Sequence, residues 1–248
     1  DRKDSMAREI IKDLDLIKKQ FSRERRTVID NVAEAVVVEK PVEEIDMVFL
    51  MDRFGYCRVI DTATYERNKE AADTENSYIV NCKNTGKLCV FTNKGNMHSF
   101  KVSDLPYGKF RDKGLPIDNV SGFDSKDEDP VLVMSRDDIS SMKFIFVSKQ
   151  SMIKFVDGSE FDVAKKTVAA TKLNDGDELK GVCVMTPETY VVMASHKGYL
   201  LKIDTTQIPE KKKTAVGVRG MKLGADDHIE EVFFGDMGTE KNIVKFHE

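Results

Sequence analysis

Lysine and arginine are the residues of this chain whose types and spacing most clearly indicate a chemistry. They recur at matching places in short segments that look alike: in turns between apolar runs, in the runs after these turns, and in the connecting stretches. Cations repeated in this way favour contacts with the phosphates of a nucleic acid rather than with its bases. The candidate phosphate-binding residues are Arg53, Arg58, Lys94, Lys101, Lys109, Arg111, Lys113, Lys149, Lys154, Lys165, Lys166, Lys197, Lys202, Lys211, Lys212, Lys213, Arg219 and Lys222.

The same lysines also allow a second interpretation. Lysines in turns keep the edges of sheets soluble and discourage pairing with other chains. The formal net charge of −4 argues against a general affinity for nucleic acid, so the local distribution of charge matters more than the total. The residues alone leave both interpretations open.

Cysteine and histidine do not form a recognisable metal-binding pattern. The four cysteines, none in a C-x-x-C pair, are Cys57, Cys82, Cys89 and Cys183. Three of them lie in apolar strand patterns, which predicts buried thiols rather than disulfides or metal ligands. The four histidines, which lack helical spacing or a partnered cysteine, are His98, His196, His228 and His247. No metal site is therefore predicted.

Catalytic signatures are also missing from the sequence. The acidic stretches 124–130 and 135–141 have no accompanying histidine or cysteine, which predicts solvated loops. There is no phosphate-binding glycine loop, dinucleotide fingerprint or nucleophile elbow. We expect this chain to be non-catalytic by itself and to hold no cofactor.

The elements that must position the cations form a repeat. Four segments, 47–60, 88–102, 144–156 and 190–203, each contain an apolar run, a polar turn and a second run that alternates basic and apolar residues. Their turns end at Gly55, Gly95, Ser151 and Gly198, which are 40, 56 and 47 residues apart. A weaker fifth copy begins at Val232 and places Gly238 another 40 residues along. Periods of this length are typical of propeller-like arrays of four-stranded blades.

A second element recurs between the hairpins. Segments 166–182 and 216–232 both contain Lys-Leu, then an aspartate, then Leu or Ile, then Val at equal spacing. Each period therefore holds a hairpin, a crossing segment and a further strand. One blade cannot bury both of its faces, whereas neighbouring blades cover each other. The sequence predicts an all-β fold of about four to five blades over 45–248, with an irregular β-sandwich as the alternative.

The region before the blades predicts one helix and a linker. In residues 5–29 an apolar stripe of Ile10, Leu14, Ile17 and Phe21 has helical spacing, and Ser5 can cap the helix. We expect a helix within 1–31 and a linker over 32–44. The chain begins with Asp1, resembles no signal sequence and has no apolar run of membrane-spanning length. We expect a fragment of a longer cytoplasmic protein.

Several of these segments resemble one family. They are "LDLIKKQFSRERRTVI", "FGYCRVI", "TNKGNMHSFKVSDLP", "NDGDELKGV" and "TAVGVRGMKLGADDHI". Together they are similar to the C-terminal domain of the A subunit of bacterial type IIA topoisomerases, DNA gyrase and topoisomerase IV. The resemblance covers almost the whole chain, and its most specific part is Gly-Val-Arg-Gly at 217–220 with the following Lys-Leu-Gly. Residues 1–31 look like the last helix of the family's breakage-reunion core.

The resemblance implies a fold and a function. The family's domain is a β-pinwheel, a propeller-like disc whose blades exchange strands and bend duplex DNA around a basic rim. This favours the phosphate-binding interpretation, without sequence preference, and a role in presenting DNA for strand passage. It also implies that the B (ATPase) subunit is a partner, that the intact A subunit dimerises, and that the intact enzyme uses ATP and Mg²⁺. The active-site tyrosine would lie in the core, outside this chain.

One departure from the family's sequence pattern bears on the choice between a gyrase-like and a topoisomerase IV-like domain. After the first hairpin, gyrases carry a box close to Q-R-R-G-G-K-G that is associated with full wrapping and negative supercoiling. Here the stretch after Tyr65 reads "ERNKEAADTENSY", with only Arg67 and Lys69 basic and no glycine. This favours a topoisomerase IV-like domain. The alternatives are a gyrase A domain with weak wrapping and a propeller-like scaffold for a protein partner, such as acidic proteins of chromosome organisation. An independent hydrolase lacks a nucleophile with a base.

Overall fold

The computed structural model describes residues 2–23 and 43–236 of the chain. It divides into two units, Asp1–Pro41 and Val42–Glu248. The first holds helix α1 (Arg2–Phe21), which confirms the predicted N-terminal helix, while residues 24–31 of the predicted span lie outside the described residues. Within the described residues, α1 and the other helices are too short or too polar to cross a membrane.

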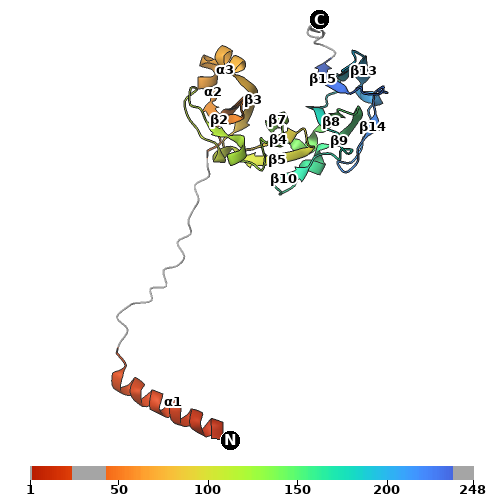
Figure 1. The fold of residues 1–248 in the computed structure, drawn as a ribbon. Helices are drawn as coiled ribbons and strands as arrows, with labels where there is room; N and C mark the ends of the chain where they lie inside the picture. The colour runs from red at the N-terminus through yellow and green to blue at the C-terminus, as the bar shows by residue number, and fades with distance from the viewer. Residues whose placement is uncertain (1, 24–42, 237–248) are drawn as a thin grey trace. The chain divides into compact units, whose positions relative to one another are not determined.

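The second unit is built from four antiparallel sheets, which we number as blades 1 to 4 along the chain (Figure 1). Blade 1 contains β1 (Asp46–Asp52), β2 (Tyr56–Asp61), β3 (Asn76–Lys83) and β6 (Leu115–Pro116). Blade 2 contains β4 (Lys87–Thr92), β5 (Asn96–Lys101), β7 (Pro130–Ser135) and β10 (Thr167–Ala169). Blade 3 contains β8 (Lys143–Ser148), β9 (Met152–Asp157), β11 (Leu179–Val184) and β14 (Val218–Arg219). Blade 4 contains β12 (Thr189–Ser195), β13 (Leu200–Asp204) and β15 (Ile229–Asp236).

Neighbouring blades exchange strands. After the hairpin of blade 2 the chain returns to blade 1, where β6 pairs with β2, and then goes back to add β7 to blade 2. The same path adds β10 to blade 2 and β14 to blade 3. We call the three returning stretches, 105–116, 162–169 and 209–219, the exchange segments. Each follows a short 3-10 turn: η1 (Val102–Asp104), η4 (Gly158–Phe161) and η5 (Thr205–Gln207), while η2 (Ile117–Asn119) and η3 (Ile139–Ser141) lie before β7 and β8.

The four hairpin turns share one construction, which explains the sequence repeat. The residue that starts the turn accepts a hydrogen bond through its side chain from the backbone N–H four residues later. Asp52 does so in blade 1, and Thr92, Ser148 and Ser195 do so in blades 2 to 4. The turns end at Gly55, Gly95, Ser151 and Gly198, which all have positive φ, between 65° and 85°. This conformation favours glycine, and Ser151 adopts it as a residue with a side chain.

The hydrophobic core lies between the blades. One cluster joins blades 1 and 2, a second joins blades 2 and 3, and a third joins blades 3 and 4. In the second cluster Phe91 packs against Phe144, Phe146 and Phe161. The predicted thiols belong to these interiors: Cys57, Cys82 and Cys89 are buried and Cys183 is half-buried, and burial raises the pKa of Cys89 to about 12.

Two short helices cover the face of blade 1 that has no preceding blade, and the sequence did not predict them. They are α2 (Thr62–Arg67) and α3 (Lys69–Glu75), and they stand where the later blades have an exchange segment. Asp61 caps α2 by accepting a hydrogen bond from the N–H of Thr64 at 2.7 Å. Beneath the helices, Val48, Leu50 and Ile60 are completely buried with Ala72. The helices therefore bury apolar surface that another blade would otherwise cover.

The weak fifth repeat has a different place in the structure. Its first residues, from Val232 to Asp236, belong to β15, which is a strand of blade 4 paired with β12. The rest of that segment lies outside the described residues. The four strong repeats are confirmed as four blades.

Candidate nucleic-acid interface

The exchange segments carry half of the predicted phosphate-binding residues, nine of eighteen. Cations outnumber carboxylates on each: three to one on 105–116, two to one on 162–169 and four to one on 209–219. Their exposed cations are Lys109, Arg111 and Lys113 on the first, Lys165 and Lys166 on the second, and Lys211, Lys212 and Arg219 on the third. Because the segments lie along the second strands of successive blades, the cations recur from blade to blade.

A groove lies between the second and third exchange segments and has a volume of about 930 Å³. Three lysines line it, Lys165, Lys172 and Lys213, together with three threonines and small apolar residues. No aspartate or glutamate is among these described lining residues. The backbone N–H of Lys172 donates to the carbonyl of Lys213 at 3.0 Å and joins the two walls. Ammonium groups and hydroxyls are donors that suit phosphate oxygens. Of the three lysines, Lys213 already donates through Nζ to the carbonyl of Glu160 at 2.6 Å.

The Gly-Val-Arg-Gly run places Arg219 at the end of the third exchange segment, in β14. Gly217 has a φ of +107°, and a Cβ there would lie 2.8 Å from the carbonyl oxygen of Ile153. Glycine therefore lets the third exchange segment approach β9, where Val218 pairs with Ile153 and Arg219 with Met152. The side chain of Arg219 is exposed.

Two of the predicted residues, Arg58 and Lys154, are buried and do not face solvent. Lys154 is 1% exposed, and its Nζ donates to the carbonyls of Lys212, Lys213 and Ala215 at 3.0, 3.3 and 2.5 Å. Burial lowers the pKa of Lys154 to about 8. Arg58 is 6% exposed and lies over the ring of Phe110 at 5.7 Å. Both side chains contact the buried side of an exchange segment, Lys154 that of the third and Arg58 that of the first.

Arg58 and Lys154 occupy the same position, the third residue after the turn, and His98 is their counterpart in blade 2. His98 is 3% exposed, and its Nδ1 lies 3.0 Å from the hydroxyl of Thr167 in β10, while Nε2 lies 2.7 Å from Glu128. In blade 4 the position holds Leu201. The sequence repeat predicted that Lys101 and Lys202 are equivalent to Arg58 and Lys154. In the structure Lys101 and Lys202 are exposed, and they stand at different positions after the turn.

Three of the cations at the hairpin turns, Lys94, Lys197 and Arg53, have local partners. The ammonium group of Lys94 forms an ion pair with Glu178 at 2.9 Å, and that of Lys197 donates to the carbonyl of Ala225. Arg53 lies over the ring of Phe54 at 4.7 Å. Lys149 is half-buried. Their charge is partly engaged within the chain, which makes them weaker candidates than the exchange-segment cations.

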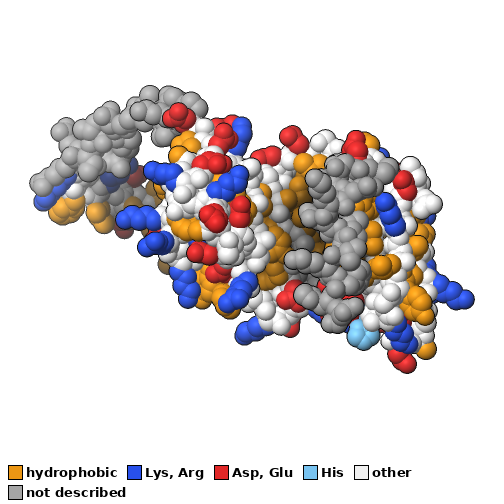
Figure 2. Space-filling view, turned by 90° about the horizontal axis from the view of Figure 1, so that it is seen from above, with side chains coloured by type: hydrophobic (Ala, Val, Ile, Leu, Met, Phe, Trp, Pro, Cys, Tyr) orange, Lys and Arg blue, Asp and Glu red, His pale blue; other side chains and the backbone are white. Residues whose placement is uncertain are grey.

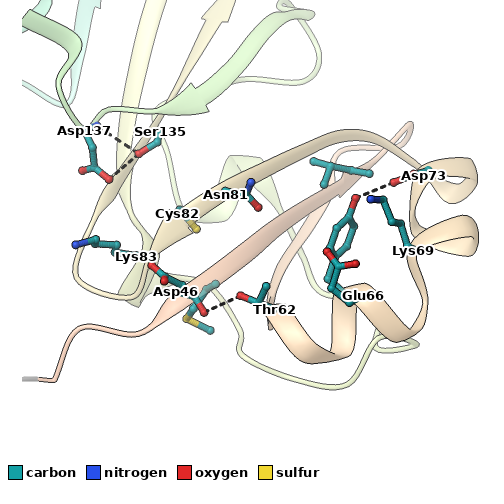
Figure 3. Close-up of a pocket in the computed structure, with 13 residues that line it drawn as sticks. Asp46, Thr62, Glu66, Lys69, Asp73, Asn81, Cys82, Lys83, Ser135 and Asp137 are labelled. Carbon is teal, nitrogen blue, oxygen red and sulfur yellow. Dashed lines mark hydrogen bonds between the residues drawn. The ribbon is translucent and has the colours of Figure 1, made fainter. Parts of the chain in front are cut away.

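Blade 1 has an acidic pocket at the place where gyrases carry the glycine-rich box (Figure 3). Its volume is about 760 Å³, and its walls come from α2, α3, β1, β3 and the turn after β7. Four carboxylates and two lysines line it: Asp46, Glu66, Asp73, Asp137, Lys69 and Lys83. Excess negative charge disfavours phosphate. Figure 2 shows acidic and basic side chains interspersed over one face of the protein.

Sequence reasoning missed two features. The first is Lys172, which lines the groove. Its Lys-Leu dipeptide recurs at Lys222-Leu223, and Lys222 was among the predicted residues. The same repeat could therefore have identified Lys172. The structure also brings together His196 and His228, which are separated by 32 positions in the sequence and showed no metal-binding spacing.

Comparisons with known proteins agree with the repeat. The family model described as the DNA gyrase C-terminal domain, β-propeller, matches residues 86–122, 143–182 and 189–234. Each matched stretch contains the hairpin of one blade. The chain is 25% identical over 225 residues to the DNA gyrase A protein of Lawsonia intracellularis and 29% identical over 226 residues to that of Helicobacter pylori. In each case the match covers 86% of this chain and 27% of the relative.

Solved structures share the fold. The C-terminal domain of a DNA topoisomerase IV superposes with a TM-score of 0.69 at 23% identity, covering 78% of this chain and 62% of that one. The E. coli ParC C-terminal domain gives a TM-score of 0.60 at 12% identity, covering 77% and 79%.

Four blades that pass strands to one another, with a basic groove between two exchange segments, define a β-pinwheel, a propeller-like class of domain. The residues that form three of these blades match one family model. The chain belongs to the family described as the DNA gyrase C-terminal domain, β-propeller, and the solved C-terminal domain of a DNA topoisomerase IV shares its fold.

Proposed function

We propose that this domain binds duplex DNA without sequence preference and bends it across the exchange segments. The observation that carries the proposal is the lysine- and threonine-lined groove between the second and third exchange segments. Its donors suit phosphate oxygens, and contacts with phosphates carry no sequence information. Bending a duplex costs free energy, which contacts repeated on successive blades offset.

The acidic pocket supports a bending role of the topoisomerase IV type over full gyrase-like wrapping. In this chain α2 and α3 stand where the glycine-rich box would be, and their pocket has more carboxylates than lysines. DNA that follows the exchange segments would therefore find fewer favourable partners for its phosphates on reaching this part of blade 1. Gyrase-like wrapping of reduced extent is the alternative.

The larger assembly is part of the same proposal. The chain spans only 27% of its gyrase relatives, so the remaining part of the enzyme would supply the strand-passage chemistry. In the intact enzyme this domain would present bent DNA to a dimeric breakage-reunion core, and a B subunit that hydrolyses ATP with Mg²⁺ would act through that core. We propose the cytoplasm as its location.

Charge reversal on the exchange segments tests the binding proposal. We expect the triple variant Lys165→Glu, Lys212→Glu, Arg219→Glu to weaken binding of a random-sequence duplex by at least about tenfold at low salt, because it removes phosphate contacts and adds repulsion. The slope of log K against log salt should fall by about 0.9 for each phosphate that is no longer neutralised. Fluorescence anisotropy at several salt concentrations measures both quantities.

The matched control carries the same change of charge elsewhere. Arg67→Glu, Lys69→Glu and Lys126→Glu alter exposed cations beside acidic residues, and we expect them to leave DNA affinity nearly unchanged. Equal weakening in both triple variants would mean that net charge alone governs binding. Unchanged affinity in the exchange-segment variant would contradict the proposal, and retention of a protein partner without DNA binding would favour the scaffold function.

A ligation experiment separates bending from chiral wrapping. A nicked plasmid is closed by ligase in the presence of increasing amounts of the protein, and the linking number is measured after the protein is removed. We expect a change in gel mobility of the complex without a steady shift in linking number, because the pocket beside α2 and α3 has more carboxylates than lysines and offers little to a wrapping duplex. A steady positive shift would instead assign gyrase-like wrapping to the domain.

A further inference from the structure

Three side chains of blade 4 converge at a place that the DNA-binding proposal does not use. His196 directly follows β12, and His228 directly precedes β15, which contains Glu230. The nitrogen and oxygen atoms that these three residues offer lie within 4.8 Å of one another. We propose that His196, His228 and Glu230 form a binding site for a transition-metal ion, with Zn²⁺ as the ion best matched to the ligands.

The backbone fixes the three residues next to each other. Strands β12 and β15 are antiparallel, and Ser195 pairs with Ile229. One residue further, the N–H of His196 donates to the carbonyl of His228 at 2.8 Å, which makes the two histidines cross-strand neighbours. Residues two apart along an extended strand point to the same side, so Glu230 joins His228. The pairing of β12 with β15 therefore places the three residues together, and the conformation of the loop between them is not needed for this.

Two of the three distances between the polar atoms are short enough for a shared ion, and all three atoms lie within 4.8 Å of one another. The Oε2 atom of Glu230 lies 2.9 Å from Nε2 of His228 and 3.3 Å from Nδ1 of His196. In a tetrahedral zinc site with bonds of about 2.0–2.1 Å, neighbouring ligand atoms are separated by about 3.3–3.4 Å. The two imidazole rings are stacked with centroids 4.8 Å apart. His196 is 61% exposed, so its ring can turn to direct Nδ1 towards the ion.

The donor set selects the class of metal. Two imidazole nitrogens and one carboxylate suit Zn²⁺ and neighbouring transition metals, whereas Mg²⁺ and Ca²⁺ prefer oxygen ligands alone. Lys180 is the nearby cation that opposes the ion. The exposed side leaves the fourth ligand position to water.

A bound ion would join the two ends of segment 196–228. This segment contains the third exchange segment with its four cations. The ion would therefore restrain the two ends of the segment that carries Lys211, Lys212 and Arg219. The metal site and the DNA groove are formed by different residues and can be tested separately.

Isothermal titration of the full chain with ZnCl₂ tests the proposal. We expect one ion per chain, and a reduction in affinity of at least about tenfold in each of His196→Ala, His228→Ala and Glu230→Gln. Zn²⁺ should also raise the melting temperature of the wild type and not that of the variants, because a ligand stabilises the state it binds. The matched control is Glu231→Gln, which neutralises the adjacent exposed carboxylate and should bind Zn²⁺ as the wild type does.

Cobalt provides a readout that needs no substitution. Co²⁺ in a tetrahedral nitrogen and oxygen site gives intense visible bands, whereas binding to cysteine adds sulfur charge-transfer bands in the near ultraviolet. We expect the first spectrum without the second. The absence of Zn²⁺ binding, equal binding by all variants, or a sulfur spectrum would each overturn the proposal.

Discussion

Replacing Phe91 by alanine is expected to lower the free energy of unfolding by about 4 kcal/mol. Phe91 is completely buried between blades 2 and 3. Its ring lies 5.4 Å from that of Phe144, 5.9 Å from that of Phe146 and 5.6 Å from that of Phe161, measured between centroids. The alanine variant loses the buried apolar surface, leaves a cavity and removes three aromatic contacts. Urea denaturation followed by circular dichroism measures the change.

Phe54 supplies the matched control for this prediction. It is the same residue type at the tip of the blade 1 hairpin, where it is 69% exposed. We expect Phe54→Ala to change the free energy of unfolding by less than about 0.5 kcal/mol. A destabilisation below about 1 kcal/mol for Phe91→Ala would contradict the close packing of Phe91 between blades 2 and 3.

Replacing Lys154 by methionine is expected to cost about 3 kcal/mol. Methionine keeps an unbranched apolar chain of similar length beneath the third exchange segment but removes the ammonium group. The carbonyl of Ala215 then loses its donor, while those of Lys212 and Lys213 each lose one of two. Buried acceptors without a donor are destabilising. Exposed Lys101→Met, on the second strand of blade 2, is the control and should have little effect.

The stability difference between wild type and Lys154→Met should depend on pH. Burial lowers the pKa of Lys154 from 10.5 to about 8. Between these values the unfolded chain binds a proton that the folded chain has lost, so the stability of the wild type rises with pH. Methionine does not titrate, and the other ionisable groups are common to both proteins. We therefore expect the deficit of the variant to grow between about pH 8 and about pH 10, and a constant deficit would contradict the lowered pKa.

We expect DNA to bind at the exchange segments, where cations are in excess, and not at the acidic pocket, where carboxylates are in excess. The sequence placed cations at turns, second strands and crossing segments alike. The structure assigns three different environments to them: buried anchors such as Lys154, locally paired turn residues such as Lys94, and exposed residues such as Arg219. Exposure and partners depend on which strands pair, which sequence spacing does not specify.

Much of the fold could be read from the sequence because it is encoded locally. Each hairpin has a turn with a positive φ, a side chain that accepts the N–H four residues later, and two apolar runs, and these requirements recur at Gly55, Gly95, Ser151 and Gly198. Residues within one hairpin are close in sequence, so their pattern is visible without knowledge of other segments. The number of strong repeats and the N-terminal helix followed from such local patterns.

Contacts between segments that are distant in the sequence could be seen only in the tertiary structure. Strand exchange brings 209–219 within reach of Lys154, and the pairing of β12 with β15 sets His196 against His228. The helices α2 and α3 pack on the face of blade 1 that is turned away from blade 2 and bury Val48, Leu50 and Ile60 there. The sequence by itself determined the blades and their family; the tertiary contacts decided which cations remain free for phosphate and which side chains meet, because burial and hydrogen bonding arise only when distant strands are joined.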